Sequence, residues 1–237
     1  MSTAGVVHVV GAGPGDPGLL TRRGARLLAE ADVVVADGRT SDDVLALVPS
    51  SAELHRVGTA DGAPPWPLAD IVDLMATRVG EGRQVVRLEA GDIFVASPVA
   101  EEVAALRARG VAVTTTPGVS TTTAASLATG MVPVPGSTVT FADDSRDHPA
   151  AFVDWGSFDE PGSTLVVLSD RAHHADIADR LTAAGVAGTT PVAIVTAPGA
   201  AGASVVRTDV AGLRATRSAP PVTLVVGPVR RRARLPG

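Results

Sequence analysis

The sequence predicts an α/β protein made of two α/β domains. Runs of β-branched residues, such as residues 6–10 and 33–36, alternate with segments whose apolar residues recur at helical spacing. The strand runs are apolar at nearly every position, which is typical of strands covered on both faces. In the first half, strands and helices alternate, and this order indicates a parallel sheet covered by helices.

The first half of the chain carries the clearer pattern. Leu20, Leu27, Leu28 and Ala31 mark a helix after the first strand, and Gly24 allows that helix to lie close to the sheet. Further segments follow in order: a strand at 33–36, a helix at 42–47, a short strand at 53–57, a loop at 58–67, a helix around 71–79, a strand at 84–88, a helix capped by Ser97 and Pro98 that runs to about 109, and a strand at 111–115.

Pro117 and Gly118 are the predicted hinge, so we expect domains at residues 1–117 and 118–237. A hydroxyl-rich helix start follows at 119–129, and the Gly/Ala run at 199–203 predicts a hairpin turn. The second domain is expected to hold a mixed sheet, with strands at 138–142, 164–169, 191–196, 204–208 and 222–226, helices at 175–184 and 209–215, and a polar loop at 143–149.

Composition excludes several functional classes. The chain has 237 residues, no cysteine and a net charge of −5. Disulfides, thiolate zinc sites and cysteine nucleophiles are therefore excluded, and general attraction to nucleic acid or anionic membranes is disfavoured. We find no signal peptide and no membrane span, so the expectation is a cytoplasmic protein. The arginines at 230–232 and 234 are interpreted as a solvated tail.

The loop at residues 11–20 is the first candidate site. Gly11, Gly13, Gly15 and Gly18 leave bare backbone at the carboxyl end of a strand, where open α/β sheets bind ligands. The spacing departs from a dinucleotide fingerprint, because Asp16 stands where the third glycine belongs and Pro14 and Pro17 remove two amide donors. The loop therefore indicates a small ligand other than a pyrophosphate.

Other polar residues have both a structural and a functional interpretation. Asp37 and Asp92 follow strands and could cap turns or bind a ligand, and residues 120–123 could cap a helix or contact a cofactor. His173 and His174 are adjacent, make a poor metal pair and are expected to be solvated. His8 is expected to be a packed residue. No metal is expected.

Several motifs, in order, carry a resemblance to a known family. VGAGPGDPGLLT (10–21) matches the first signature of the tetrapyrrole methylases almost residue for residue, and VVRLEAGDIF (85–94) resembles their second, usually VVRLKGGDPF. PGVSTTTAA (117–125), VTF (139–141), PVAIV (191–195) and PPVTLVVGPV (220–229) fall where the family places similar segments. The resemblance spans essentially the whole chain and is strongest to the uroporphyrinogen-III C-methyltransferase branch.

The resemblance implies a homodimer that binds S-adenosylmethionine between its two domains and methylates a tetrapyrrole such as uroporphyrinogen III, in precorrin-2 formation, leaving S-adenosylhomocysteine. It implies substrate handling by Asp37, which matches the aspartate of the family's YDRLV segment. The implied cofactor residues are Pro14, Ala90, Gly91, Asp92, Val95, Ser120, Thr121, Thr122, Leu168, Ser169, Asp170, Ala197, Val222 and Thr223.

The chain departs from the family pattern near the implied site. The tyrosine of YDRLV is Ala36, the lysine of the second signature is Glu89, and its glycine and proline are Ala90 and Ile93. Two alternatives therefore stay open. One is a methylase-fold protein with a different acceptor or without turnover. The other is an NAD-dependent oxidoreductase in which Asp37, about twenty residues after the loop, binds the ribose.

Overall fold

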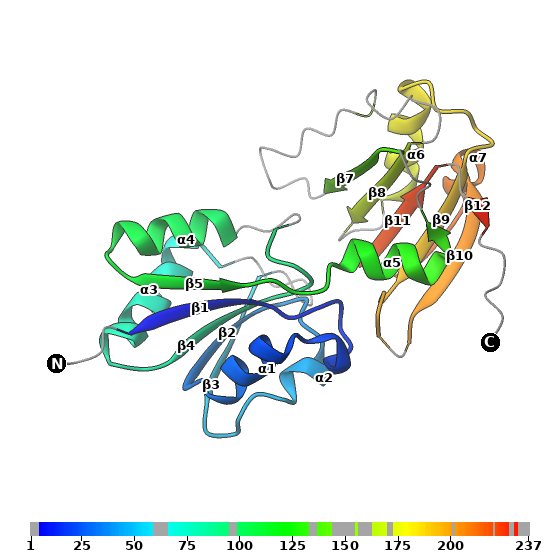
Figure 1. Ribbon diagram of the computed structural model, residues 1–237. Helices are drawn as coiled ribbons and strands as arrows, with labels where there is room; N and C mark the ends of the chain where they lie inside the picture. Colours follow the sequence, from blue (N-terminus) through cyan, green and yellow to red (C-terminus); the bar gives the residue numbers. More distant parts are fainter. Residues whose placement is uncertain are drawn as a thin grey trace. The chain divides into compact units, whose positions relative to one another are not determined.

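The computed structural model divides into two units, Met1–Ser120 and Thr121–Gly237 (Figure 1). It describes residues 5–58, 66–94, 99–132, 137–143, 155, 163–169, 173–200, 202–219, 221–227 and 230–231. Among these residues, no helix has the length and apolar character needed to cross a membrane.

The first unit is a five-stranded parallel sheet in the order β3-β2-β4-β1-β5. Its inner strands are buried over most of their length because their Val-rich sequence is covered by helices on both faces. The strands are β1 (Val6–Gly11), β2 (Val33–Asp37), β3 (Glu53–Val57), β4 (Val85–Glu89) and β5 (Ala112–Thr116).

The helices of this unit divide between the two faces of the sheet. One face packs on α3 (Leu68–Gly80) and α4 (Val99–Ala108). The other face packs on α1 (Arg22–Ala29), which follows the short 3-10 helix η1 (Pro17–Leu19), and on α2 (Asp42–Leu45). Gly24 of α1 lies against Val10, so a methyl group there would stand 3.0 Å from Val10 Cγ1. The neighbouring strands β1 and β4 thus lead to helices on opposite faces, which makes the carboxyl ends of β1 and β4 a topological switch point.

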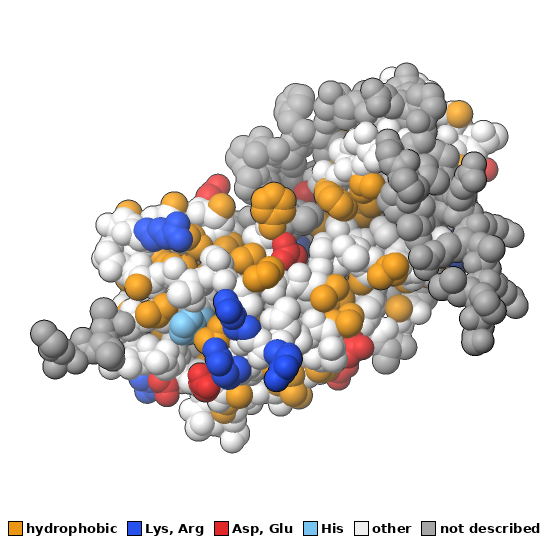
Figure 2. Space-filling model, in the orientation of Figure 1, with side chains coloured by type: hydrophobic (Ala, Val, Ile, Leu, Met, Phe, Trp, Pro, Cys, Tyr) orange, Lys and Arg blue, Asp and Glu red, His pale blue; other side chains and the backbone are white. Residues whose placement is uncertain are grey.

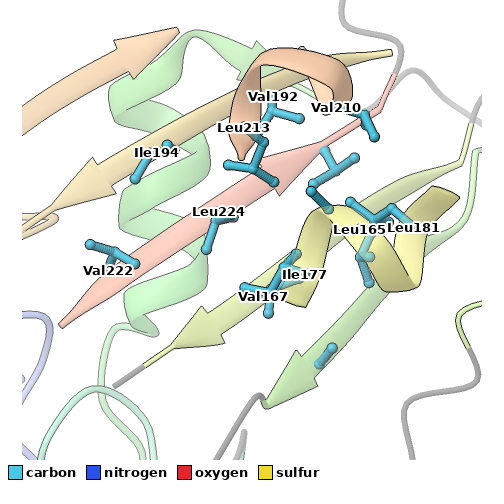
Figure 3. Packing of buried hydrophobic residues seen from close by; sticks show 13 residues of the cluster. Leu165, Val167, Ile177, Leu181, Val192, Ile194, Val210, Leu213, Val222 and Leu224 are labelled. Carbon is cyan, nitrogen blue, oxygen red and sulfur yellow. The ribbon is translucent and has the colours of Figure 1, made fainter. Parts of the chain in front are cut away.

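The second unit holds a mixed five-stranded sheet in the order β10-β9-β11-β8-β7, in which only β7 and β8 are parallel. Helix α5 (Thr121–Thr129) covers one face, while α6 (His174–Ala183) and α7 (Val210–Leu213) cover the other. Figure 3 shows the apolar cluster beneath α6 and α7. The strands are β7 (Val139–Asp143), β8 (Thr164–Ser169), β9 (Pro191–Thr196), β10 (Ser204–Asp209) and β11 (Val222–Val226).

The predicted α/β class is confirmed, and the strands and helices expected within the described residues are present. The turn between β9 and β10 forms the expected hairpin. The tail was interpreted incorrectly in part, because Arg230–Arg231 forms a short strand, β12, paired with β6 (Met131–Val132). His174 is also buried rather than solvated, and its ring nitrogens lie 3.1 Å from Thr216 O and 3.2 Å from Ser218 Oγ.

Candidate functional site

The switch point of the first sheet brings two glycine loops together. Gly13 and Gly91 exchange backbone hydrogen bonds, with Gly13 N 3.0 Å from Gly91 O and Gly91 N 2.8 Å from Gly13 O. Ala12 N also donates to Glu89 O at 2.7 Å. The loop after β1 and the loop after β4 therefore form one small backbone platform at the carboxyl edge of the sheet.

A third loop joins this platform through close backbone contact. A methyl group on Gly118 would stand 2.3 Å from Gly91 O, and one on Gly11 would stand 2.5 Å from Gly118 N. Side chains cannot be accommodated at such distances, so the glycines at these positions are required for the loops to meet. The segment after β5 thus lies directly against the loops after β1 and β4.

Asp92, a predicted cofactor residue, holds two of these loops in place. Its Oδ2 accepts a hydrogen bond from Gly118 N at 3.0 Å, and its Oδ1 accepts one from Phe94 N at 2.9 Å. Both carboxylate oxygens are therefore used by backbone amides. Ser41 similarly donates to Gly15 O at 2.7 Å, which ties the loop after β2 to the first loop. Pro14 and Ala90 are half-buried, and Gly91 is buried.

Asp37 ends β2 at the same edge, and Arg39 holds it tightly. Asp37 Oδ1 accepts from Arg39 N at 2.7 Å and from Arg39 Nε at 3.1 Å, while Oδ2 accepts from Arg39 Nη2 at 3.2 Å. Burial raises the pKa of Asp37, but the Arg39 charge and hydrogen bonds outweigh it and hold the pKa below its ordinary value. Asp37 is thus both a turn-capping residue and an ionised carboxylate.

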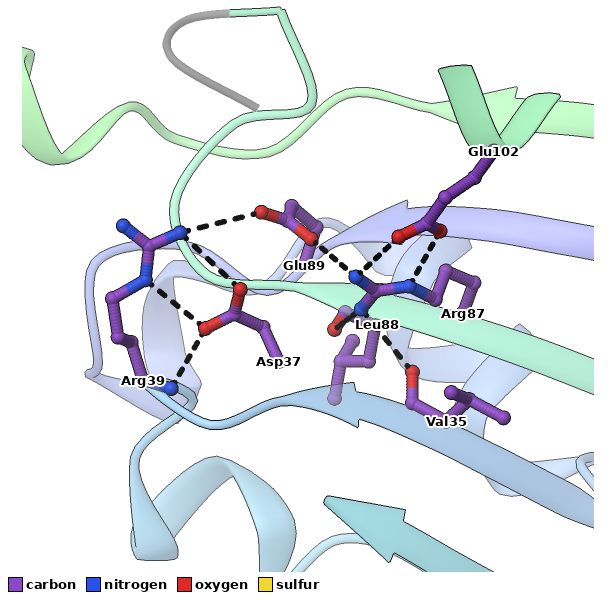
Figure 4. A network of polar contacts seen from close by, with 7 residues as sticks. All are labelled: Val35, Asp37, Arg39, Arg87, Leu88, Glu89 and Glu102. Carbon is purple, nitrogen blue, oxygen red and sulfur yellow. Dashed lines mark hydrogen bonds and ion pairs between the residues drawn. The ribbon is translucent and has the colours of Figure 1, made fainter. Parts of the chain in front are cut away.

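Behind Asp37 lies a row of buried charges that sequence reasoning did not find (Figure 4). Arg87, Glu89 and Glu102 are each at most 2% exposed. Arg87 donates to both Glu102 oxygens, from Nε at 2.7 Å and from Nη2 at 2.9 Å, and Nη2 lies 3.1 Å from Glu89 Oε2. That last contact has ion-pair distance without hydrogen-bond geometry, so Glu89 Oε2 has no hydrogen-bond donor.

Glu89 is the unusual member of this row. Burial is the largest influence on its carboxyl and, together with the nearby Asp37, raises its pKa to about 7 against the opposing charges of Arg87 and Arg39. Its Oε1 lies 3.6 Å from Arg39 Nη2. A signal was present in the sequence, because an arginine in the apolar run VVRL of a central strand requires a buried acidic partner.

The hydroxyl segment after β5 lies where one unit ends and the other begins. Ser120 is the last residue of the first unit, and Thr121 and Thr122 open α5. Ser120 and Thr121 are half-buried, whereas Thr122 is buried. Hydroxyls and backbone amides at a helix start suit a carboxylate, and contact of this segment with a cofactor stays a prediction.

The predicted residues of the second unit gather at one end of its sheet. Val222 lies opposite both Ser169 and Thr196, and Thr223 lies opposite Leu168. Ala197 directly follows β9 at this end and has a φ of +47°, a left-handed conformation that is uncommon for any residue but glycine. The structure thus brings together the five residues that the sequence named here: Leu168, Ser169, Ala197, Val222 and Thr223.

Some expectations fall elsewhere. Val95, Asp170, Ser97 and Pro98 lie outside the described residues, as do most of the loops at 58–67 and 143–149. His8 lies in β1 with its Nδ1 2.7 Å from Thr114 Oγ1. In the part of the chain that is described, no group of three or more His, Asp or Glu side chains is placed to hold a metal ion.

The fold and this edge define an α/β protein whose glycine loops meet at the carboxyl ends of parallel strands, which is where open α/β sheets bind small ligands. The loops lack the donor pattern of a phosphate cradle, and both Asp37 oxygens are engaged by Arg39 rather than open to a ribose. The chain belongs to the tetrapyrrole (corrin/porphyrin) methylase family, whose sequence model matches residues 6–214.

Individual relatives agree with this assignment. The chain is 37% identical over 199 residues to siroheme synthase 1 of Serratia proteamaculans, covering 81% of this chain and 41% of the relative. It spans half or less of the curated siroheme synthases that it matches. Among solved structures, the native uroporphyrin-III C-methyltransferase of Thermus thermophilus is 30% identical with a TM-score of 0.80, covering 94% of this chain and 97% of that one.

A second Thermus thermophilus structure includes a ligand. It is the uroporphyrin-III C-methyltransferase complexed with S-adenosylhomocysteine, 30% identical with a TM-score of 0.76, covering 93% of this chain and 91% of that one. The similarity thus extends over both units to a protein solved with the product of methyl transfer bound.

Proposed function

We propose that this protein is an S-adenosylmethionine-dependent C-methyltransferase acting on a tetrapyrrole such as uroporphyrinogen III, forming precorrin-2. The observation that carries the proposal is the likeness, over 93% of the chain, to the Thermus thermophilus enzyme complexed with S-adenosylhomocysteine. The family assignment supports it, and so do the curated relatives named siroheme synthase. We further propose that the protein is a cytoplasmic homodimer.

The donor set fits this cofactor. S-adenosylmethionine has a sulfonium, an amino group, a carboxylate and an adenine, but no phosphate. The predicted contacts offer bare backbone at Gly91, hydroxyls at Ser120, Thr121 and Thr223, and no lysine or arginine. Pro14, Ala90 and Asp92 of the first unit are proposed as further contacts, and so are Thr122, Leu168, Ser169, Ala197 and Val222 of the second unit. Val95 is proposed on the resemblance alone.

When bound, S-adenosylmethionine supplies an electrophilic methyl group. The chain's own residues then have two tasks. The glycine platform orients the reactants for in-line displacement, and such positioning can lower the barrier by about 7–11 kcal/mol. Asp37 accepts, as a general base, the proton that the acceptor must lose after methyl addition has left its ring system cationic.

The acceptor of the proposed reaction carries several carboxylates, and exposed arginines lie beside the first loop. Arg22, Arg23 and Arg26 occupy exposed positions of α1, directly after that loop. Figure 2 shows basic side chains gathered over this part of the first unit. They offer charge-assisted hydrogen bonds to an acidic acceptor, in place of the lysine of the second family signature, which is Glu89 in this chain.

The test is a pair of measurements on the full chain. Calorimetric titration with S-adenosylhomocysteine should show binding, with none for NADH, and labelled methyl groups should transfer to uroporphyrinogen III. Asp37→Asn should lose methyl transfer and keep affinity for S-adenosylhomocysteine. Unchanged turnover in this variant would remove Asp37 from the mechanism, and binding of NADH instead would replace the methylase by an oxidoreductase.

One observation favours a second candidate, a methylase-fold protein that binds cofactor without turnover. Arg39 engages both oxygens of Asp37, and this lowers the basicity of the carboxylate. Binding of S-adenosylhomocysteine without methyl transfer to uroporphyrinogen III or to precorrin acceptors would support this candidate.

A further inference from the structure

The row of buried charges, taken together with Asp37 and the partly exposed Arg39, contains one carboxyl more than it has guanidinium groups. The carboxyl groups belong to Asp37, Glu89 and Glu102, and the guanidinium groups belong to Arg39 and Arg87. Arg87 is fully paired with Glu102, and Arg39 with Asp37. The row is therefore neutral only when Glu89 holds a proton, and an additional buried negative charge is costly.

The surplus carboxyl lies against the group that restrains Asp37. Arg39 Nη2 is 3.2 Å from Asp37 Oδ2, within hydrogen-bond distance, and 3.6 Å from Glu89 Oε1, just beyond it. A single nitrogen thus lies between two carboxyl groups, and Figure 4 shows it there. A protonated Glu89 leaves this nitrogen on Asp37, whereas an ionised Glu89 attracts it by a full charge at close range.

We propose that Glu89 is a positioning residue whose ionisation draws Arg39 from Asp37 and so exposes Asp37 Oδ2 as the base. The inference rests on the proposed methyl transfer. Once the methyl group has bonded to the acceptor carbon, Asp37 Oδ2 takes a proton from an N–H or bridging C–H group of the acceptor, and the electron pair of that bond returns to the cationic ring system of the acceptor. Glu89 itself touches neither acceptor nor cofactor, because its carboxyl is buried behind Arg39.

The surroundings of Glu89 support this assignment. Facing it are Asp37 and Arg39 from β2 and the segment after it, Arg87 from β4, and Glu102 from α4. On the other side β1 contributes only Gly11 opposite Glu89. Burial raises the pKa of Glu89 to about 7, so its charge changes in the neutral range. Ionised Glu89 also raises the basicity of Asp37, because like charges disfavour each other.

The first experiment needs no turnover. In the full protein, the ¹⁵N resonance of Arg39 Nε and the carboxyl ¹³C resonance of Glu89 are followed against pH. We expect both to move with one midpoint near neutrality, and Glu89→Gln to abolish the Arg39 movement. An Arg39 resonance that keeps the same neutral midpoint in Glu89→Gln, or that does not move in the wild type, would overturn the proposal.

The second experiment is the pH profile of methyl transfer to uroporphyrinogen III. In the wild type the rate should rise through neutral pH. In Glu89→Gln it should stay low and flat, roughly tenfold or more below the wild type on the alkaline side, since an exposed general base contributes at least that much. Glu89→Asp should restore a rising profile at a displaced midpoint.

The matched control is Glu102→Gln, which alters the same buried row at the Arg87 end. It should lower stability and move the rise in rate to lower pH, because a neutral residue 102 leaves Arg87 to pair with Glu89, and the row is then neutral with Glu89 ionised. A rate that stays low and flat in Glu102→Gln as well would assign the effect to the whole row and contradict a specific role for Glu89. Calorimetry with S-adenosylhomocysteine checks that each variant keeps its site.

The outcomes separate this inference from the proposed function. If the wild type transfers no methyl group, the proposed function fails, while the resonances of Arg39 and Glu89 still decide whether their coupling exists. If the wild type turns over and Glu89→Gln has an unchanged pH profile, the proposed function stands and the role of Glu89 is refuted.

Discussion

The two sheets have five strands each, yet they present different chemistry at the edges where the predicted site residues lie. In the first unit the strands are all parallel, so every connecting loop returns through a helix and the loops after β1, β2, β4 and β5 meet at one edge. That edge carries glycine platforms and buried charges. In the second unit the neighbouring strands are mostly antiparallel, and the corresponding end presents backbone, small apolar residues and hydroxyls.

The difference teaches that perturbed ionisable groups and neutral candidate residues belong to different sheets. Every ionisable side chain with a resolved pKa shift lies in the first unit, among the described residues. The described candidate residues of the sheet in the second unit are neutral, and Ala197 has a strained backbone rather than a charge. Changes in the first unit should therefore alter stability and pH response, whereas changes in the second should act through packing and backbone shape.

The largest effect is expected from Glu102→Ala. It breaks the buried Arg87–Glu102 ion pair and removes both of its hydrogen bonds, and the loss of one partner of such a pair costs about 3–5 kcal/mol. The measurement is urea unfolding of each unit separately, because the two tryptophans fall in different units: Trp66 in the first and Trp155, packed on the apolar core, in the second. Trp155→Phe leaves Trp66 as the reporter, and Trp66→Phe leaves Trp155.

The matched change in the second unit is Leu224→Ala, a fully buried apolar side chain whose loss costs about 2–5 kcal/mol. Glu102→Ala should move the Trp66 transition and Leu224→Ala the Trp155 transition. If either change moved both transitions equally, the two units would unfold as one. That result would contradict the view that each unit responds separately to changes in its own sheet.

The next effect is a pH dependence that belongs to the first unit alone. Glu89 has an ordinary pKa of 4.5 and a folded pKa of about 7. Between these values the folded state keeps a proton that the unfolded state releases, so stability falls as pH rises through this window, by about 3 kcal/mol at 1.36 kcal/mol per pKa unit. Above the window the full cost of the buried charge is present.

Glu89→Gln should remove that decline in urea unfolding monitored by Trp66, while the transition of Trp155 stays unchanged. Titration of Asp37 does not contribute in this pH window, because its pKa is lowered below 3.8. The folding stability that ionised Asp37 provides is lost only at more acid pH. A Trp66 transition whose pH dependence is identical in wild type and variant would place the surplus proton on another group.

A smaller effect is expected where the three glycine loops touch. Gly118→Ala would put a methyl group 2.3 Å from Gly91 O, and both partners are backbone, so the loops must separate. We expect a loss of about 1–3 kcal/mol in the first unit. Gly202→Ala in the second unit has open space around it and should stay within about 0.5 kcal/mol. A Gly118→Ala variant with unchanged stability would show that the three loops can move apart without loss of stability.

The sequence predicted what depends on local pattern. Valine runs located the strands, glycines and prolines located the loops, and the alternation of elements predicted a parallel sheet. What it could not predict depends on strand order. The sequence places Glu102 near the start of a predicted helix, but it does not show that β4 lies where Arg87, 15 residues earlier, can pair with it. Asp37 was identified, but the hold of Arg39 on both its oxygens required the turn geometry.

The smallest effect tests the strained end of the second sheet. Ala197 has a φ of +47°, and an alanine in this region costs about 1–2 kcal/mol, which glycine avoids. Glycine also gives the unfolded chain more conformational entropy, which stabilises the unfolded state by about 0.4–1 kcal/mol. The net effect of Ala197→Gly should therefore be to raise the stability of the second unit by at most about 1 kcal/mol.

Affinity for S-adenosylhomocysteine should fall in the same variant, because a glycine leaves this turn less ordered before binding. The Trp155 transition measures the first effect and calorimetry the second. A less stable Ala197→Gly variant would mean that the exposed methyl group stabilises the turn more than its conformation strains it. The Ala197 side chain would then contribute a stabilising contact at the end of the second sheet. The backbone conformation of Ala197 would no longer be what distinguishes this end from the charged edge of the first sheet.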